Sequence, residues 1–364
     1  MKDLFLRFIG IDLGKRSMEV HIIDSNEKHS TWNCQTDTSG RLRLLSKLKP
    51  TDIIAMEACP LAFILYTMIK ESLGSKVFVL NPLGLAMIYK STKKTDREDA
   101  AKLAWVIQRL PEEELPIVIV PSKDEQNLRY LVAEQVELTQ NRTREINRLH
   151  ALFTQDGITT IKKKDLVNSK SRERKYSLLS ASIKERALRY EKIIYVLEEN
   201  LENVETQILK EVSVHERTPF LLSIPGVGPN LIAAYLGYLG TGERFTANTI
   251  TAYAGLLPRL DYSGESNKYG PITKRGCPIL RRAIVQAAWA LVRSKNGGCL
   301  QNKYFELKTR KGYSKALVAI ARKLLKTMWL LSTRKTMYLN LDPAKYRAKL
   351  DKYEVRWAGV LAVA

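Results

Sequence analysis

The stretch KSTKKTDREDAAKLAW, from Lys90 to Trp105, places two aspartates at the start of an apolar helix, directly after a basic run. Asp96 and Asp99 are three residues apart, so a helix holds their carboxylates on one face. Helix capping explains part of this pattern, because Thr95 with Glu98 three positions later has the form of a capping box. Capping does not explain Asp99. The role of the pair therefore depends on whether other acids lie close to it in the folded chain.

The elements that precede this helix predict a mixed α/β domain. Their patterns of apolar residues and turn residues indicate strands at 4–13, 17–24 and 29–37, a helix at 39–49, a strand at 52–58, a helix at 61–74 and a strand at 76–82. Three strands in a meander, followed by alternating helices and strands, are the order of a ribonuclease-H/RuvC-like domain. Such a domain has a mixed sheet with helices on both faces.

Acids lie where these elements end. Asp12 closes the first strand, Glu57 closes the fourth, and Asp96 and Asp99 open the helix after the fifth. In this fold the first and fourth strands are adjacent and parallel, so their carboxyl ends share one edge of the sheet. Four carboxylates at one place require a cation, and hard oxygen ligands suit a pair of Mg²⁺ ions. We therefore predict these four acids as the catalytic and metal-binding residues of phosphodiester transfer.

The charge balance indicates a nucleic-acid partner. The 364 residues include 59 Lys and Arg against 38 Asp and Glu, a net charge of +21 with a pI near 9.7. Residues 1–121 hold 17 basic and 15 acidic residues, whereas 259–335 hold 18 basic and 3 acidic. An acidic membrane surface is the weaker alternative. The asymmetry predicts chemistry in the first domain and polyanion binding in the last.

Cysteine and histidine usage argues against structural zinc and disulfides. Four cysteines are widely spread without a CxxC pair, and four histidines form no HxxxH. This usage fits a reducing cytoplasm. Arg7 and Asp12 interrupt the early apolar run, so we expect no signal peptide, and no apolar stretch approaches the ~18 residues of a membrane span.

The middle of the chain predicts two long helices that pair antiparallel. Ser122 and Glu125 form a capping box before a helix that runs toward Phe153, and a basic loop with three consecutive lysines follows. Apolar residues then alternate spacings of four and three, the heptad seam of a coiled coil, at Ile183, Ala187, Tyr190, Ile194, Leu197, Leu201, Val204 and Ile208. This segment is either a solvated spacer or also a contact between two copies of the chain.

The last third resembles a helix-hairpin-helix. In SIPGVGPNLIAAYLG the turn from Gly226 to Gly228 precedes an apolar helix, where backbone N–H groups can face a DNA phosphate. An ordinary tight turn between helices is the alternative interpretation. A further helix begins at Pro278, with Arg281 and Arg282 away from its apolar face.

Blocks along nearly the whole chain resemble the IS110 family of DEDD-type insertion-sequence transposases, also described as bridge-RNA-guided recombinases. These blocks are FIGIDLGKRSMEV, AMEACP, KTDREDAAKLA, SIPGVGPNLIAAYLG, AYAGLLPRLDYSGES and ITKRGCPILRRAIVQAAW. The resemblance places the four family acids on the residues predicted above. This chain departs from the family pattern at Cys59-Pro60, where Thr-Gly is frequent, and at Cys277, where an Asn or similar residue is frequent.

The patterns along the chain predict four segments: a RuvC-like catalytic domain (1–121), a coiled coil (122–215), a C-terminal helical domain (216–340), to which the resemblance adds a catalytic serine, and a tail (341–364). The resemblance also implies a structured bridge RNA beside donor and target DNA, a dimer or tetramer, and a prokaryotic, nucleoid-associated location. The expected nucleic-acid contacts are Gly226, Gly228, Arg259, Lys268, Lys274, Arg275, Arg281 and Arg282.

The resemblance assigns the catalytic serine to Ser263, in LDYSGES. From the residues alone this is a polar turn between apolar helices. Cations nearby in sequence could hold a scissile phosphate. A serine hydroxyl needs activation, and since no histidine lies near Ser263, the carboxylate-bound Mg²⁺ is the expected activator. The resemblance further implies a covalent phosphoserine link to DNA.

Three other functions compete with this interpretation. A structure-selective nuclease of the Holliday-junction-resolvase type shares the acids but does not need the serine. An actin-like ATPase or sugar kinase should carry a second phosphate loop and a Gly-Gly adenosine motif, and the sequence has neither. A basic binding protein with purely structural acids would not cleave DNA.

Overall fold

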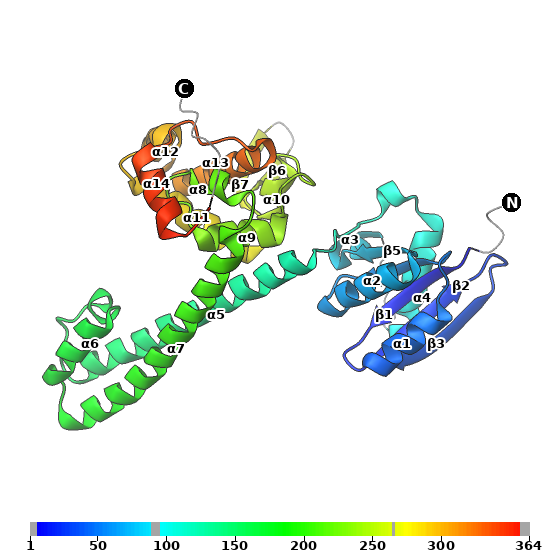
Figure 1. Ribbon diagram of the computed structural model, residues 1–364, viewed down its shortest axis with the longest axis horizontal. Helices are drawn as coiled ribbons and strands as arrows, with labels where there is room; N and C mark the ends of the chain where they lie inside the picture. The colour runs from blue at the N-terminus through cyan, green and yellow to red at the C-terminus, as the bar shows by residue number, and fades with distance from the viewer. Residues whose placement is uncertain (1–5, 89–94, 264–265, 357–364) are drawn as a thin grey trace. The chain divides into compact units, whose positions relative to one another are not determined.

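The computed structural model describes residues 6–88, 95–263 and 266–356, without the side chains of 260–269 (Figure 1). The chain divides into two compact units, Met1–Pro121 and Ser122–Ala364. In the described part of the chain, no helix combines the length and the apolar character needed to cross a membrane.

The N-terminal unit is built on a five-stranded mixed sheet with the order β3-β2-β1-β4-β5. The strands are β1 (Phe8–Leu13), β2 (Ser17–Ile23), β3 (His29–Gln35), β4 (Ile53–Glu57) and β5 (Lys76–Leu80). β1, β2 and β3 form an antiparallel meander, while β1 pairs parallel with β4 and β4 parallel with β5. The mixed sheet and the adjacency of the first and fourth strands are confirmed, and they are consistent with a RuvC-like domain.

Helices cover both faces of this sheet. They are α1 (Thr38–Lys47), α2 (Pro60–Leu73), α3 (Pro82–Ile88) and α4 (Asp96–Arg109). Buried Ile9 and Ile11 of β1 belong to one core, which includes residues of α1 and α2, and Ala55 of β4 belongs to another, which includes residues of α4. The predicted last strand is too long at its end, because Pro82 begins α3, where its fixed φ suits the first helical position.

Two long antiparallel helices, α5 (Lys123–Gln155) and α7 (Ala181–Ser213), extend from the core of the C-terminal unit (Figure 1). The predicted capping box at the start of α5 is present. Cross-helix hydrogen bonds run from Asn127 to Glu211, from Gln135 to Glu205 and from Arg142 to Glu198. Partner numbers fall along α7 as they rise along α5, which confirms the antiparallel pairing within one chain.

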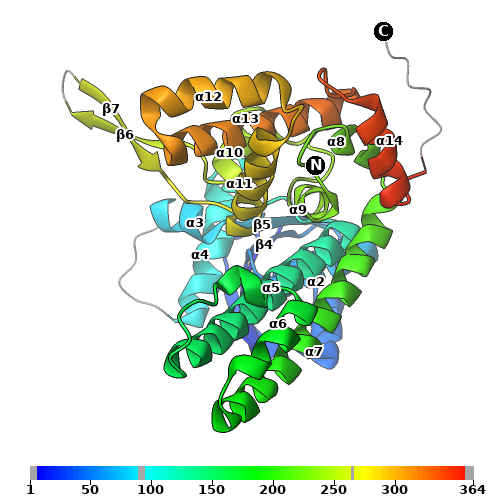
Figure 2. The ribbon, with the colours of Figure 1, turned by 90° about the vertical axis from the view of Figure 1, so that its left-hand side faces the viewer.

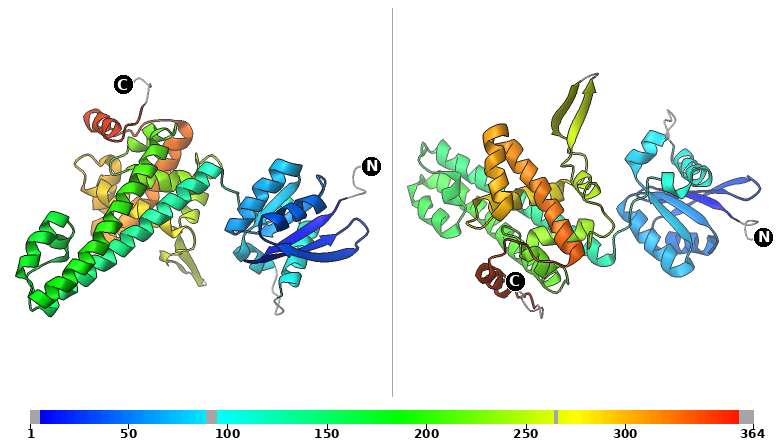
Figure 3. Two further views of the ribbon diagram at one scale, coloured as in Figure 1. Left: turned by 60° about the horizontal axis from the view of Figure 1, so that its bottom comes forward. Right: turned by 90° about the horizontal axis from the view of Figure 1, so that it is seen from above.

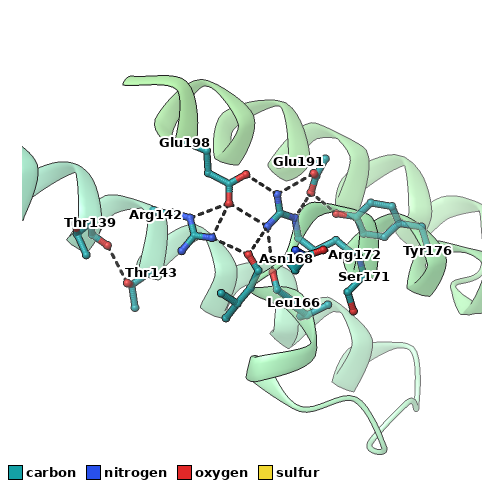
Figure 4. A network of polar contacts seen from close by, with 11 residues as sticks. Thr139, Arg142, Thr143, Leu166, Asn168, Ser171, Arg172, Tyr176, Glu191 and Glu198 are labelled. Atoms are coloured by element: carbon teal, nitrogen blue, oxygen red, sulfur yellow. Dashed lines mark hydrogen bonds and ion pairs between the residues drawn. The ribbon is translucent and has the colours of Figure 1, made fainter. Parts of the chain in front are cut away.

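A buried ionic network closes the far end of this helix pair (Figure 4). Short segments η2 (Lys163–Leu166), α6 (Ser169–Lys175) and η3 (Tyr176–Leu178) connect the two helices. Arg172 of α6 is fully buried and forms ion pairs with Glu191 at 2.8 Å and Glu198 at 2.9 Å. Although burial opposes it, hydrogen bonds from Arg172 and Arg142 hold the pKa of Glu198 below its usual value. The network therefore fastens α6 to α7.

The rest of the C-terminal unit is a helical bundle from which a hairpin projects (Figures 2 and 3). Its elements are α8 (Thr218–Leu222), α9 (Pro229–Leu239), α10 (Thr249–Tyr253), β6 (Pro258–Ser263), β7 (Ser266–Ile272), α11 (Pro278–Arg293), α12 (Gly298–Lys311), α13 (Tyr313–Arg334) and α14 (Pro343–Lys352). One core joins residues of α9, α11 and α13 to the start of α5 and to Tyr346 of α14. The segment 343–352 is thus packed on the bundle.

Candidate functional site

A glycine brings α4 close to the sheet. A Cβ atom on Gly10 of β1 would overlap the carbonyl oxygen of Ala100 and lie 2.5 Å from the main-chain nitrogen of Ala104. One helical turn before Ala100 covers about 5.4 Å, close to the roughly 6.7 Å between Gly10 and Asp12 along the strand. The first turn of α4 lies near the end of β1 that carries Asp12, since the charges of Asp96 and Asp99 both raise the pKa of Asp12.

Strand register places Asp12 and Glu57 on the same face of the sheet. Gly10 pairs with Ala55 of β4, and each acid lies two residues beyond its member of this pair. Because side chains alternate along a strand, both acids face the side covered by α4. The sheet and the helix thus bring together the ends of the three elements on which the acids were predicted.

The pKa of Asp12 reflects the negative charges near it. Burial is the largest cause that raises the pKa of Asp12 to about 6. The negative charges of the other predicted acids also raise it, in the order Asp96, Asp99 and Glu57, whereas a hydrogen bond from the Leu13 amide acts in the opposite direction. Each of the three acids therefore lies within electrostatic range of Asp12.

The predicted acids lie near one another, but their side chains are not arranged as a complete set of metal ligands. Within the described residues, no three His, Cys, Asp or Glu side chains are close enough together to hold a metal ion. Asp99 accepts a hydrogen bond from Lys102 at 2.6 Å, one turn along α4. Thr95 caps the helix by accepting from the Glu98 amide at 3.3 Å. The donor set consists of carboxylates only, a chemistry that suits a hard divalent cation.

Two charged residues at this site were missed from the sequence. Glu19 of β2 is the cross-strand partner of Asp12, so its side chain lies on the same face. Counting the alternation of β2 back from its turn would have identified it. Lys102, the ion-pair partner of Asp99, follows it by three residues, a spacing that places both on one helix face.

The two cysteines that depart from the family pattern are helix caps. Cys59 Sγ accepts from the Ala62 amide at 3.4 Å at the start of α2, and Cys277 Sγ accepts from the Leu280 amide at 3.5 Å at the start of α11. Each is followed by a proline at the first helical position. The thiols therefore take the N-cap position that Ser, Thr, Asn and Asp usually occupy.

Four of the predicted basic residues of the last third lie near the foot of the β6–β7 hairpin. Arg259, Lys274 and Arg275 are exposed at the foot of the β6–β7 hairpin. Arg281 instead donates to the carbonyls of Ala254 at 3.0 Å and Lys274 at 3.1 Å, so it fixes this foot. The side chains of Ser263 and Lys268 lie outside the described residues.

The prediction of a loop between helices at Ser263 is wrong. Ser263 ends strand β6, and its backbone pairs with Ser266 of β7. The hairpin was missed because β6 is short and β7, with Gly270 and Pro271, has neither regular apolar alternation nor typical strand residues.

The turn from Gly226 to Gly228 borders a groove of about 1060 Å³ between the long helices and α9 and α11. Gly226 has φ +80°, and a Cβ there would lie 2.7 Å from the Leu291 nitrogen, so this glycine permits close packing against α11. Arg282 lines the groove, but so does Glu205, which accepts a hydrogen bond from Asn230 in the first turn of α9. The groove thus carries both signs of charge.

Lys349 of α14 binds the backbone of the segment that leads into the turn from Gly226 to Gly228. Its ammonium donates to the carbonyls of Leu222, Ile224 and Val227 at 2.8–3.0 Å. Burial lowers the pKa of Lys349 to about 8. This contact links α14 to the turn and was not predicted from the sequence.

Comparisons with known proteins place both units in one family. A family model described as a transposase, of the DEDD type of IS110, matches residues 9–156, and the model of the transposase IS116/IS110/IS902 family matches residues 218–304. A probable family 20 transposase of Pseudomonas aeruginosa is 26% identical over 91% of this chain and 98% of its own length.

Two further relatives align over most of the chain. The transposase for insertion sequence element IS1328 of Yersinia enterocolitica is 27% identical over 91% of this chain and 98% of its own length. The transposase for IS1111A of Coxiella burnetii is 25% identical over 93% of this chain and 92% of its own length. Together with the two family models in chain order, these similarities make the chain a transposase of the IS110 family of insertion sequences.

Proposed function

We propose that this transposase cuts and rejoins DNA strands with a divalent metal bound by Asp12, Glu57, Asp96 and Asp99. The proposal is supported by the strand register that sets Asp12 and Glu57 on one face of the sheet next to α4, and the charges of Asp96, Asp99 and Glu57 add to burial in raising the pKa of Asp12. A carboxylate surrounded by carboxylates is destabilised as an anion, and a bound cation removes that repulsion. Mg²⁺, with two ions per site, is the metal that the ligand chemistry favours.

The bound metal would supply Lewis-acid activation of a nucleophile and stabilisation of the leaving oxygen. The chain's own residues prepare the site: Gly10 sets the approach of α4, Thr95 fixes its first turn, and Lys102 holds Asp99. Glu57 and Asp12 are fixed by the pairing of β4 with β1. The acids lie on β1, β4 and α4, and Thr95 caps α4, so the site is built on regular elements as a catalytic constellation requires.

Ser263 is the proposed nucleophile. Its Oγ would form a bond to a DNA phosphorus while the phosphodiester bond to one side of the strand breaks, and the serine proton would end on the departing hydroxyl. The phosphoserine ester conserves the energy of the broken phosphodiester bond, so the strand can be rejoined without another energy source. Support comes from the family resemblance and from the exposed cations Arg259, Lys274 and Arg275 near the hairpin foot, which suit a phosphate.

The partners in this proposal are donor DNA, target DNA and a structured bridge RNA, acting on a dimer or tetramer of the chain. The net charge of +21 supports polyanion binding. Purification of the protein from its native host, followed by sequencing of the RNA that accompanies it, tests the RNA. Recovery of only random cellular RNA would contradict it.

The serine is tested by a denaturing-gel assay for a protein–DNA adduct with DNA from the ends of the insertion sequence. The unmodified protein should form the adduct, and Ser263→Ala should bind DNA equally but form none. An adduct with Ser263→Ala would refute the assignment. Strand cleavage that survives this substitution would favour the second candidate, a structure-selective nuclease of the Holliday-junction-resolvase type.

A further inference from the structure

Four aromatic rings from three helices form one continuous cluster in the C-terminal unit, where α11, α12 and α13 pack together (Figure 2). This ring cluster consists of Trp289 of α11, Tyr304 and Phe305 of α12, and Tyr313, the first residue of α13. Ring centroids are 4.9 Å apart for Trp289 and Tyr313, 6.5 Å for Tyr304 and Tyr313, and 5.4 Å for Tyr304 and Phe305. The rings meet edge to face, so each supports its neighbour.

The cluster has a buried anchor and two rings open to solvent. Tyr304 is 3% exposed, whereas Phe305 is 51% and Tyr313 is 42% exposed. Gly312, with φ +77°, ends α12 and sets the position of Tyr313 at the start of the next helix. Packing of the bundle explains the buried ring. It does not explain why two large aromatic rings that both contact Tyr304 are exposed to water.

Cations are frequent in the helices that carry the ring cluster, and one of them contacts a ring of the cluster. The guanidinium of Arg293 lies 4.7 Å from the centre of the Trp289 ring. The last turn of α12 adds three exposed cations, Lys308, Arg310 and Lys311. The sequence has a single acid from Arg293 to Lys335, Glu306, which pairs with Lys303 at 2.7 Å and with Arg310 at 3.9 Å. The surface therefore combines aromatic faces with an almost unopposed positive charge.

The geometry points to a binding site for unpaired nucleotides at this ring cluster. Bases of a single strand can stack on exposed aromatic rings while lysines and arginines contact the phosphates, a combination that serves single-stranded nucleic acid. Bases inside a duplex are already stacked and cannot use the rings. The charge complementarity also disfavours a basic protein segment or a second copy of this basic chain. The inference rests on the proposed function, since it assumes that the enzyme handles nucleic acid.

Binding of labelled oligonucleotides to the full-length protein tests this site. The probes are a single strand of about 16 nucleotides, as DNA and as RNA, and the corresponding duplex, all at one salt concentration. The double substitution Phe305→Ala with Tyr313→Ala should weaken single-strand binding by about tenfold per ring and leave duplex binding within about twofold. Weaker binding of the variant to single-stranded DNA, to single-stranded RNA or to both supports the site and identifies which nucleic acid it binds.

Two further variants separate stacking from folding. Phe305→Leu with Tyr313→Leu keeps apolar volume but removes the planar faces, so it should bind single strands as weakly as the alanine pair. Tyr130→Ala, which removes a 62% exposed ring on α5, is the matched control and should change nothing. Equal loss of single-strand and duplex binding, full retention by the leucine pair, or an equal effect of Tyr130→Ala would overturn the inference. If the unmodified protein binds no probe, the proposed function itself fails.

Discussion

Replacement of Asp12 by asparagine should stabilise the metal-free protein. The raised pKa means that the folded chain holds the Asp12 carboxylate at a higher free energy than the unfolded chain does. A displacement from 3.8 to about 6 corresponds to at most about 3 kcal/mol. Because Asp12 is only partly buried, solvent screening reduces this value, and we expect a gain of about 1–2 kcal/mol at pH 7.

The sign of the pH dependence follows from the same shift. Since the pKa is raised on folding, the folded chain binds more protons between pH 3.8 and 6, and stability falls as the pH rises through this window. Asparagine does not ionise, so the Asp12→Asn variant does not lose stability in this window. It should therefore be more stable than the native protein at pH 7 and equally stable near pH 4. Added Mg²⁺ should reverse the ranking, since only the native acid set gains from the cation.

Hydrogen exchange of the β1 and β4 amides, measured by mass spectrometry in EDTA and in Mg²⁺, reports the free energy of opening in this unit. Glu113→Gln, at an exposed acid of the same unit, is the matched control and should leave the exchange unchanged. Faster exchange of Asp12→Asn than of the native protein in EDTA would refute the electrostatic argument. So would an advantage that persists at pH 4.

Further substitutions test other parts of the structure. Gly10→Ala should destabilise the N-terminal unit by about 1–3 kcal/mol, because backbone of α4 blocks the new methyl group; unchanged thermal unfolding would contradict this. Cys59→Ser should raise the stability of the same unit by about 0.5 kcal/mol, since a hydroxyl accepts the amide better than a thiol does, and a lower melting temperature would count against it. Arg172→Ala removes the ion-pair partner of Glu191 and one of the two arginines that pair with Glu198, and it should cost about 3 kcal/mol, seen as faster exchange confined to α6 and the adjoining end of α7; equal protection of the variant and the native protein would show that the network adds no stability. Nucleic-acid affinity should fall steeply with salt, and Arg275→Gln should reduce the slope of log K against log salt by about 0.9, whereas Lys28→Gln in the N-terminal unit should not alter it.

The N-terminal unit was predictable because its elements follow simple periodicities. Strands with Val, Ile and Phe alternate or run continuously, and Gly74 and Thr95 mark helix boundaries. The acids at the ends of β1 and β4 are still identified correctly when the predicted end of a strand is wrong by one or two residues. Gly10 was not identified, because close backbone packing depends on the partner helix, which sequence spacing does not show.

The C-terminal unit was predicted less well, for a physical reason. The β6–β7 hairpin was missed because β7 includes Asn267, Gly270 and Pro271, residue types that are uncommon in strands. Contacts between distant segments, such as Lys349 with the turn that follows α8, leave no local signal. Arg281 was predicted as a nucleic-acid contact from its charge alone, yet its guanidinium holds two carbonyls of the chain.

The most direct test of the central claim is metal-dependent strand cleavage of DNA from the ends of the insertion sequence, with Asp12→Asn and Asp99→Asn beside the unmodified protein. We predict that the unmodified protein cleaves with Mg²⁺ and not with EDTA, and that both variants bind the DNA with unchanged affinity but do not cleave it. Full cleavage by both variants would contradict the assignment of the carboxylates to a catalytic metal site.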